Sequence, residues 1–255
     1  MRVLKIGGNE LSDPAFVALL GRIVANLLAE TASPLAIVHG GGRAIADLQG
    51  RLGLETVKVE GLRVTDQASL DVAEMVLSGH SNKIVVKALL AAGVDALGIS
   101  GVDGGLLRCR KKKHPTADLG YVGEIVQVRR DLLDRLLGMG ATPVISPISL
   151  GLDGQTYNVN ADEAAAAVAR TCEAQELVFI SNVPGVLRDD DVISKLTAAE
   201  VEDAVAGGTI SGGMIPKVRS ALDAVNSGVA RARIVNLAGL LAGGGTAVVA
   251  GDGVD

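Results

Sequence analysis

Aromatic and sulfur-containing residues are scarce in this 255-residue chain, which has no tryptophan, two phenylalanines, two tyrosines and two cysteines. Its core must therefore consist of aliphatic side chains, which typically fill a parallel sheet covered by helices on both faces. Cys109 and Cys172 have no metal-ligand spacing, and with the missing signal-peptide pattern they favour a reducing cytoplasm.

Positive charge is not in excess, because the formal net charge is −5 and the sequence pI is about 5.3. This balance gives no electrostatic reason to expect nucleic acid or an anionic membrane as a partner. Polar and charged residues interrupt the apolar runs, so we expect none to approach the ~20 residues of a membrane span.

Glycine is abundant, with 33 of the 255 residues, about 13 % against an average near 7 %. The glycines follow apolar runs, which indicates tight turns after strands or backbone brought close to a ligand.

Short β-branched runs alternate with helical stretches, and this pattern predicts an α/β fold with a mainly parallel sheet. We expect a hairpin between Leu106 and Val128, one continuous sheet, and a boundary near Gly151–Gln155 that separates lobes 1–152 and 153–255. The predicted strands are Arg2–Ile6, Leu35–His39, Ala96–Ile99, Thr142–Ile145, Leu177–Ile180, Arg233–Val235 and Thr246–Val249. The predicted helices are Pro14–Glu30, Arg43–Leu52, Gln67–Ser78, Asn82–Ala92, Asp131–Met139, Ala161–Thr171, Ala198–Ala206 and Met214–Ser227.

Two glycine-rich loops follow the first two strands: KIGGN (Lys5 to Asn9) and HGGGR (His39 to Arg43). Ligands bind beyond the carboxyl ends of parallel strands, where glycine amides and a following helix N-terminus favour phosphate. The alternative is two tight strand-to-helix turns. Neither G-x-x-x-x-G-K-[ST] nor a G-x-G-x-x-G after a strand is present, so a P-loop kinase and a dinucleotide dehydrogenase lose their main support.

The stretch SGGMIPKV (Ser211 to Val218) predicts a glycine turn that enters a helix, with Pro216 in its first turn. Lys217 then lies at the positive end of the helix dipole, which is unfavourable by about 0.3–1 kcal/mol. Violations of this kind concentrate at functional sites. The alternative is an exposed lysine that extends into water.

The segment NVNADEAA (Asn158 to Ala165) has a structural explanation, because Asn160 and Glu163 fit a capping box. If Asp162 instead lies opposite Lys5 and Lys217, it would hold both ammonium groups in position.

In order along nearly the whole chain, these segments resemble the acetylglutamate kinase branch of the amino acid kinase family. The matching motifs are KIGGN, IVHGGG, EGLRVTD (Glu60 to Asp66), EMVLSG, the pair Asn82–Lys83, GISGVDGGL, DLGYVGE (Asp118 to Glu124), GQTYNVNAD, SNVPGV and TISGGMIPKV.

The resemblance implies a three-layer αβα sandwich around an open, mainly parallel sheet. The N-terminal lobe would bind the acyl amino acid and form a homodimer, and the C-terminal lobe would bind ATP, with Mg²⁺ carried by the nucleotide. The implied reaction phosphorylates the γ-carboxylate of N-acetyl-L-glutamate in arginine biosynthesis. That carboxylate is ionised at pH 7, so it needs no general base. We accordingly expect His39 to pack at a strand end and His80 and His114 to lie in loops.

The resemblance also implies roles for individual residues. Lys5 and Lys217 would neutralise the phosphoryl group, and Asp162 would orient them. Gly7, Gly8, Gly41 and Gly42 would supply amides to the phosphoryl oxygens. The other implied contacts are Gly41, Gly42, Arg63, Asn158 and Asn160 with the acyl amino acid, and Ser181, Asn182, Gly185, Gly212 and Gly213 around the nucleotide.

Departures from the family pattern leave alternatives open. Ser181-Asn182-Val183 replaces the usual Thr-Asp-Val and is similar to kinases of carrier-protein-linked aminoadipate or glutamate, whereas EGLRVTD and DLGYVGE favour the acetyl group. A non-catalytic amino-acid sensor is a third possibility, against which the retained charged residues argue. The chain begins near its first strand and lacks the Asp-Gly-Arg of arginine-inhibited members, so we expect no arginine inhibition. The basic run RCRKKKH (Arg108 to His114) predicts a solvated hairpin tip or, alternatively, a contact with an anionic substrate or acidic partner.

Overall fold

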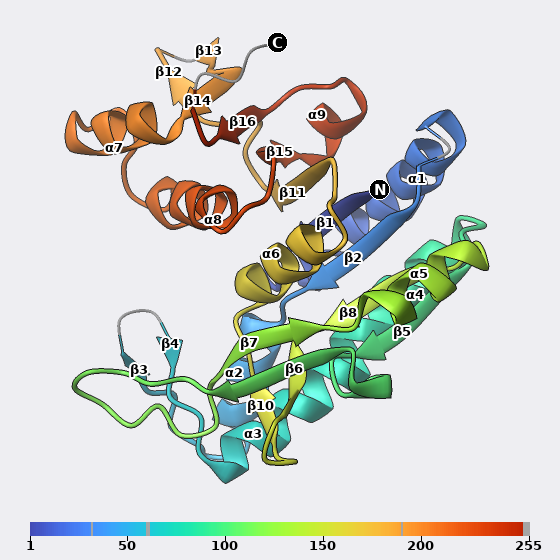
Figure 1. The fold of residues 1–255 in the computed structure, drawn as a ribbon, viewed down its shortest axis with the longest axis vertical. Coiled ribbons are helices and arrows are strands. Elements are labelled where there is room, and N and C mark those ends of the chain that lie inside the picture. Colours follow the sequence, from blue (N-terminus) through green and yellow to red (C-terminus); the bar gives the residue numbers. More distant parts are fainter. Residues whose placement is uncertain (32, 60–61, 190, 252–255) are drawn as a thin grey trace.

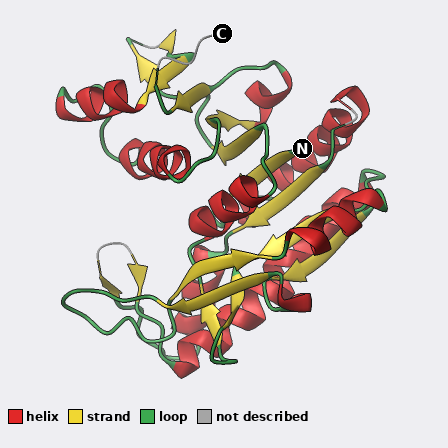
Figure 2. Ribbon diagram, in the orientation of Figure 1, coloured by secondary structure: helices red, strands yellow, loops and turns green. Residues whose placement is uncertain are grey.

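The computed structural model describes residues 1–31, 33–59, 62–189 and 191–251. A central eight-stranded sheet has the order β14-β16-β15-β11-β1-β2-β8-β5, and all neighbours are parallel except β15 and β16. Helices cover both faces (Figure 1, Figure 2), which confirms the predicted αβα sandwich. The strands are β1 Arg2–Ile6, β2 Leu35–His39, β5 Ala96–Ser100, β8 Thr142–Ser146, β11 Glu176–Ser181, β14 Lys195–Thr197, β15 Ala232–Asn236 and β16 Thr246–Val249.

Alternation along β1 decides which side chains reach each helical layer. Val3 belongs to one core and Leu4 and Ile6 to the other, because successive side chains of a strand point to opposite faces. Lys5 therefore points to the same face as Val3. That face carries the helices α5, α6 and α8.

Each helical layer seals one core. The layers contain α1 Pro14–Thr31, α4 Asn82–Ala91 and α9 Leu237–Leu241 on one face, and α5 Arg130–Gly138, α6 Ala161–Thr171 and α8 Met214–Asn226 on the other. α7 Ala198–Ala206 packs beside β14 and α8, and α2 Gly42–Arg51 packs against α3 Gln67–Glu74 in a third, smaller cluster. Strands of both predicted lobes share the sheet, since β1 pairs with β11; the boundary at residues 152/153 stays a prediction.

One helix of the described chain, α1, has the length and mean hydropathy, 1.3, of a membrane span. The expectation that no segment would come near such a length was therefore wrong. Leu20, Ile23, Val24 and Leu27 recur at the spacing of one helix face and are buried against the sheet, which is the pattern of an amphipathic core helix.

The helix predicted for Gln67–Ser78 differs from the structure. α3 ends at Glu74, and a π-helix, Met75–Ser81, continues without a break into α4. His80 lies in this π-helix, so its expected place in a loop was wrong. The other predicted helices and strands are present to within one residue at each end.

The predicted hairpin is part of a second sheet, in the order β10-β9-β6-β7. No prediction covered its strands β9 and β10, or β14, α9 and several short elements. The bounds are β6 Leu107–Lys111, β7 Gly123–Val128, β9 Ile148–Gly151 and β10 Thr156–Asn158, with the short elements β3 Lys58–Val59, β4 Leu62–Arg63, β12 Leu187–Arg188, β13 Asp191–Val192, and the 3₁₀ turns Glu10–Ser12 and Asp103–Gly105.

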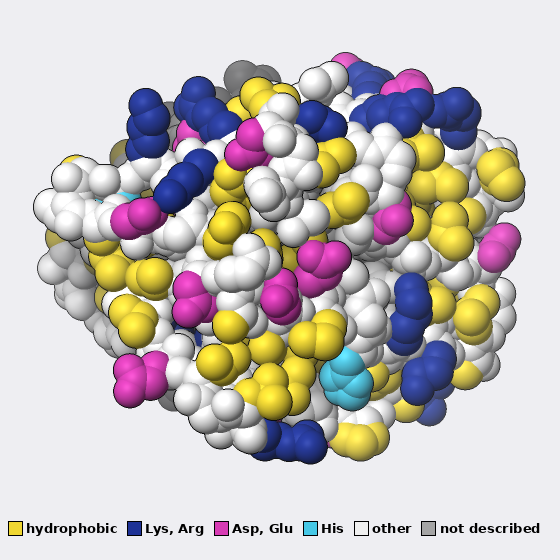
Figure 3. Space-filling view, turned by 90° about the horizontal axis from the view of Figure 1, so that it is seen from below, with side chains coloured by type: hydrophobic (Ala, Val, Ile, Leu, Met, Phe, Trp, Pro, Cys, Tyr) yellow, Lys and Arg dark blue, Asp and Glu magenta, His cyan; other side chains and the backbone are white. Residues whose placement is uncertain are grey.

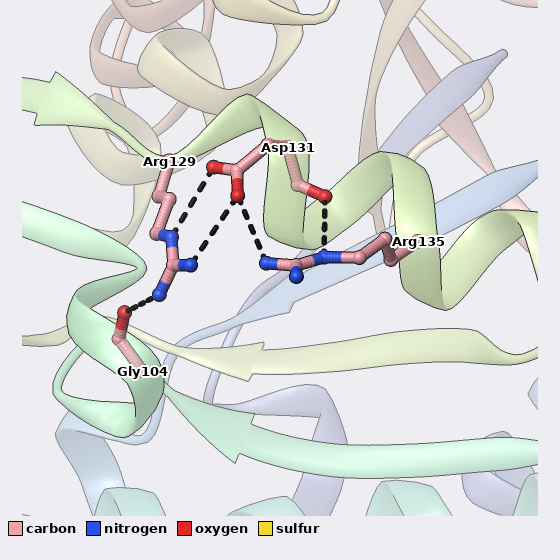
Figure 4. Close-up of polar contacts among 4 residues, drawn as sticks. All are labelled: Gly104, Arg129, Asp131 and Arg135. Carbon is pink, nitrogen blue, oxygen red and sulfur yellow. Dashed lines mark hydrogen bonds and ion pairs between the residues drawn. The ribbon is translucent and has the colours of Figure 1, made fainter.

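A charged cluster ties α5 to the turn after the edge strand β5 (Figure 4). Arg129 Nη1 donates to the carbonyl of Gly104 at 2.7 Å, and the Asp131 carboxylate accepts from both Arg129 and Arg135. The hydrogen bond from Arg129 lowers the pKa of Asp131. Gly104 has a φ of 59°, which glycine adopts readily, so this carbonyl can face the arginine.

Candidate active site

The two glycine loops lie side by side at the carboxyl ends of β1 and β2, which pair in parallel. A Cβ atom added to Gly8 would lie 2.5 Å from both the Cα and the amide nitrogen of Gly41 and 2.7 Å from the nitrogen of Gly42. The two backbones touch, so any side chain at Gly8 would separate them.

Beyond these strand ends is a cavity of about 420 Å³, a size typical of small-molecule sites. Most of the residues predicted for the site line it, although they come from segments far apart in the sequence. Those that do are Lys5, Gly7, Gly8, Gly41, Gly42, Arg63, Asn158, Asn160, Asp162, Ser181 and Lys217.

Asp162 pairs with Lys5 across the cavity, with 2.7 Å between Lys5 Nζ and Asp162 Oδ1. Its other oxygen, Oδ2, accepts from Ser220 Oγ at 3.2 Å. Asn160 caps α6, because its Oδ1 accepts from the amide of Asp162 at 2.7 Å. Three elements, β1, α6 and α8, therefore hold this carboxylate in place.

Glu163 does not complete the predicted capping box. Its carboxylate instead accepts from the amide of Ile125 at 3.0 Å and from Lys112 Nζ at 2.9 Å. Glu163 thus ties the start of α6 to the β6–β7 hairpin.

Lys217 reaches the cavity from the first turn of α8. Its Nζ donates to Ser181 Oγ at 2.5 Å and to Asn182 Oδ1 at 2.9 Å. Burial lowers the pKa of Lys217, Glu10 opposes this effect, and Lys5 adds to it. The end of β11 thus holds Lys217 in this structure, whereas Asp162 pairs with Lys5. The role of Asp162 in orienting both lysines stays a prediction.

Arg63 is fixed beside the second glycine loop. Its Nη1 donates to Gln49 Oε1 and, at 3.1 Å, to Thr56 Oγ1, and its Nη2 donates to the carbonyl of Gly42 at 3.1 Å. Burial lowers the pKa of Arg63. The anchored guanidinium is thus directed at one end of the cavity, where an anion would neutralise it.

The motifs EGLRVTD and DLGYVGE meet at that end of the cavity. The amide of Thr65 donates to the carbonyl of Leu119 at 3.0 Å, and the amide of Tyr121 donates to the carbonyl of Thr65 at 2.7 Å. Asn158 joins them, because its Nδ2 donates to Thr65 Oγ1 at 3.4 Å. Glu60 and Gly61, the first residues of EGLRVTD, lie outside the described residues.

Four predicted nucleotide residues do not line the cavity. Asn182 accepts a hydrogen bond from Lys217, but it lies outside the cavity lining. A Cβ on Gly185 would lie 2.7 Å from Val192 and 2.8 Å from Thr246 Oγ1, so a packing role explains this glycine. Gly212 and Gly213 form the turn into α8, and their roles around a nucleotide stay predictions.

Sequence reasoning missed Glu10 and Ser220, which both line the cavity. The Glu10 carboxylate lies directly over Gly7. Ser220 follows Lys217 by three residues, and this spacing places two side chains on one helix face, so that signal was available. Glu10 gave no comparable signal.

The basic run is paired largely within the molecule. Arg110 pairs with Glu124, Lys111 with Asp118 at 2.8 Å, and Lys112 with Glu163 at 2.9 Å. The expected hairpin tip begins on β6 and reaches the base of α6, so Lys112 connects the hairpin to the helix that carries Asp162.

Comparison with known proteins identifies the family of this chain. The sequence model of the amino acid kinase family matches residues 1–236. The chain belongs to this family. Among curated members, the acetylglutamate kinase of Roseiflexus castenholzii is 53 % identical over 251 residues, covering 98 % of this chain and 95 % of that protein. The acetylglutamate kinase of Methanopyrus kandleri is 43 % identical over 256 residues, covering 97 % and 100 %.

Solved structures share the family fold. A protein from Streptococcus mutans has a TM-score of 0.81 and 29 % identity, with 98 % of both chains covered. An N-acetylglutamate synthase from Neisseria gonorrhoeae, in complex with coenzyme A and N-acetyl-glutamate, has a TM-score of 0.83 and 26 % identity. That match covers 98 % of this chain and 59 % of the synthase.

Proposed function

We propose that this chain is an acetylglutamate kinase, which transfers the γ-phosphoryl group of ATP to the γ-carboxylate of N-acetyl-L-glutamate in arginine biosynthesis. The observation that carries the proposal is the convergence of Lys5, Asp162 and Lys217 with two touching glycine loops in one cavity. The full-length likeness to acetylglutamate kinases supports the choice of substrate.

The residues suit transfer between two anions. An acceptor carboxylate is ionised at neutral pH and needs no base, so the barrier lies in bringing it to the charged phosphoryl group. Lys5 from one side and Lys217 from the other supply positive charge. The glycine amides at Gly8, Gly41 and Gly42 supply donors at short range.

The acyl amino acid would bind at the end of the cavity that Arg63 and Asn158 line. Arg63 would pair with its α-carboxylate in a two-pronged contact, and Asn158 and Asn160 would face the acetamido group. ATP would approach from the side of β11 and α8, where Ser181 and Lys217 lie. The N-terminal lobe would thus hold the acceptor and the C-terminal lobe the nucleotide.

Mg²⁺ would enter with the nucleotide. Within residues 1–31, 33–59, 62–189 and 191–251, no group of three or more His, Cys, Asp or Glu side chains is placed to hold a metal ion. Asp162 is already bound to Lys5 and Ser220. We therefore expect phosphate oxygens and water to hold the Mg²⁺ ion. The ion would neutralise charge on the phosphates.

Ser181 and Asn182 also bear on the alternative substrate, a carrier-linked aminoadipate or glutamate. Both side chains contact Lys217 and not the acyl end near Asn158. This departure from the family motif therefore changes the anchor of a lysine and gives no support to a carrier-linked blocking group.

The test is ADP release with N-acetylglutamate, glutamate, aspartate, carbamate and UMP as separate acceptors. We expect turnover with N-acetylglutamate to exceed the others. Equal rates, or a preference for another acceptor, would refute the proposal. A carrier protein loaded with aminoadipate or glutamate tests the alternative, and binding of amino acids without ADP release would favour a sensor.

We further propose a homodimer in the cytoplasm that arginine does not inhibit. β5 is an edge strand, with Leu97 43 % exposed, and Leu90 of the neighbouring α4 is 53 % exposed. An edge strand with apolar neighbours invites pairing with a second copy. The face seen in Figure 3 intersperses its hydrophobic side chains with acidic and basic ones. Light scattering should give about twice the 25.9 kDa of one chain, whereas a hexamer or inhibition by arginine would refute this.

A further inference from the structure

Two buried polar side chains lie directly behind the second glycine loop. His39 ends β2 and Asn82 begins α4, and neither side chain is exposed to solvent. The distance between Asn82 Nδ2 and His39 Nε2 is 3.1 Å, and that between His39 Nδ1 and the carbonyl oxygen of Gly40 is 3.0 Å. The expected packing role of His39 is therefore incomplete, because both ring nitrogens have specific partners.

The partners assign every proton in this chain of bonds. Asn82 Nδ2 also donates to the carbonyl of Val144 at 2.8 Å, and Asn82 Oδ1 accepts from Lys83 Nζ at 2.9 Å. Asn82 thus presents its amide hydrogens to His39, so Nε2 must be the acceptor. A neutral imidazole carries its single hydrogen on the other nitrogen, and Nδ1–H therefore donates to Gly40.

The carbonyl of Gly40 and the amide of Gly41 belong to one planar, trans peptide unit, in which C=O and N–H point in opposite directions. A donor that fixes the carbonyl on the buried side therefore fixes the amide on the cavity side. Gly41 lines the cavity, and within the described residues its amide nitrogen has no protein acceptor.

We propose that His39 and Asn82 are positioning residues: Asn82 sets the tautomer of His39, and His39 orients the Gly40–Gly41 peptide so that the Gly41 amide faces the phosphoryl group. This inference rests on the proposed phosphoryl transfer. His39 is buried and does not line the cavity, so it acts only through the loop.

The surroundings preserve this arrangement. Burial lowers the pKa of His39 to about 4, so the ring stays neutral at physiological pH and keeps one donor and one acceptor. Gly98 lies against Asn82 Oδ1 and Lys83 Nζ, where a Cβ would collide with both. Glycine at this position leaves room for the asparagine.

Two substitutions of His39 separate orientation from packing. In His39→Asn the side-chain amide lies near the former Nδ1 and can donate to Gly40, whereas in His39→Gln it lies near the former Nε2 and contacts Asn82 alone. Both variants lose ring volume. We expect the kcat of His39→Gln to be about 10- to 100-fold lower than that of His39→Asn, with little change in the KM values. This loss is smaller than the ~10²–10³-fold fall in rate that follows deletion of a donor, because the Gly41 amide is misoriented and not removed.

Unfolding midpoints of both variants control for stability. Equal kcat values, or losses that follow the unfolding midpoints, would overturn the proposal and leave His39 a packing residue. Rescue by asparagine without a corresponding gain in stability would support it.

Nitrogen-15 NMR of the wild-type imidazoles tests the same inference without activity. We expect a neutral His39 with hydrogen on Nδ1 and none on Nε2; the opposite tautomer would overturn the proposal. If N-acetylglutamate is not a substrate, the proposed function fails, whereas the tautomer and the two-variant comparison, made with whichever acceptor reacts, still decide the role of His39.

Discussion

Ser220 Oγ lies 3.2 Å from Asp162 Oδ2, and the other oxygen of the same carboxylate, Oδ1, pairs with Lys5 Nζ at 2.7 Å. Ser220 and Lys217 share one face of α8, so a single helix supplies both a positive charge and the hydroxyl that steadies the carboxylate opposite. The orientation of Lys5 therefore depends on α8 as well as on β1.

Replacing Ser220 with alanine should lower kcat about 3- to 10-fold. A hydrogen bond to a charged group contributes ~1.5–3 kcal/mol, and only part of that acts on the transition state. Ser227→Ala is the matched control, because Ser227 directly follows the same helix and its hydroxyl donates to the carbonyl of Ala224. Steady-state rates that fall equally in both variants would show a general destabilisation of α8 and no specific role for the Ser220 hydroxyl.

Lys217→Met should reduce kcat by ~10²–10³, the usual effect of removing one group that stabilises transition-state charge. The unfolding midpoint of the ligand-free protein should not fall, because the lysine is partly desolvated and lies near the positive charge of Lys5. Lys113→Met, in the exposed loop after β6, is the control. Near-normal turnover of Lys217→Met would refute the mechanism and leave the fold unaffected.

The lowered pKa of Lys217 has a consequence for the pH profile. The ammonium loses its proton at a lower pH than an ordinary lysine, so its favourable charge disappears earlier as pH rises. The value of kcat/KM for MgATP, which reports the free enzyme, should therefore fall on the alkaline side below the range of ordinary lysines. In Lys217→Arg this decline should move to higher pH; an unchanged profile would assign it to another group.

Gly8→Ala should lower both the unfolding midpoint and kcat, because the new methyl group would collide with the backbone of Gly41 and Gly42. Gly79→Ala is the matched control, since a Cβ there meets nothing within 4 Å. Removing a helical glycine at a compatible site typically stabilises by ~0.4–1 kcal/mol. Thermal unfolding and initial rates distinguish the two variants; normal activity of Gly8→Ala would show that the loops can separate without loss.

Arg63→Lys should raise the KM for N-acetylglutamate about 10- to 100-fold and leave the KM for MgATP unchanged. Lysine lacks the fork that both holds Gln49 and Gly42 and pairs with a carboxylate. Arg110→Lys, which alters the exposed pair with Glu124, is the control. An equal rise in both KM values would place Arg63 outside the acyl amino acid site.

Local sequence information determined the elements and the position of the anion site. The short apolar runs of β1 and β2, their alternation with helical stretches, and the glycines that follow each strand predicted the parallel sheet and the two loops. These features depend on residues that are close together in the chain. Because β1 and β2 run in the same direction, the loops that follow them lie at the same edge of the sheet. The position of Lys217 at the start of a helix likewise identified a residue whose local placement is unfavourable.

Tertiary structure alone decided the partners of the charged groups. Lys217 bonds Ser181 across 36 residues, His39 meets Asn82 across 43, and Ser220 reaches Asp162 across 58. The sequence offered Asp162 as the partner of both lysines, because charge and motif order contain no distances. Packing of α8 against β15 and α6 fixed the actual contacts, since a hydrogen bond requires atoms within about 3 Å and only the assembled sheet and helices set that separation.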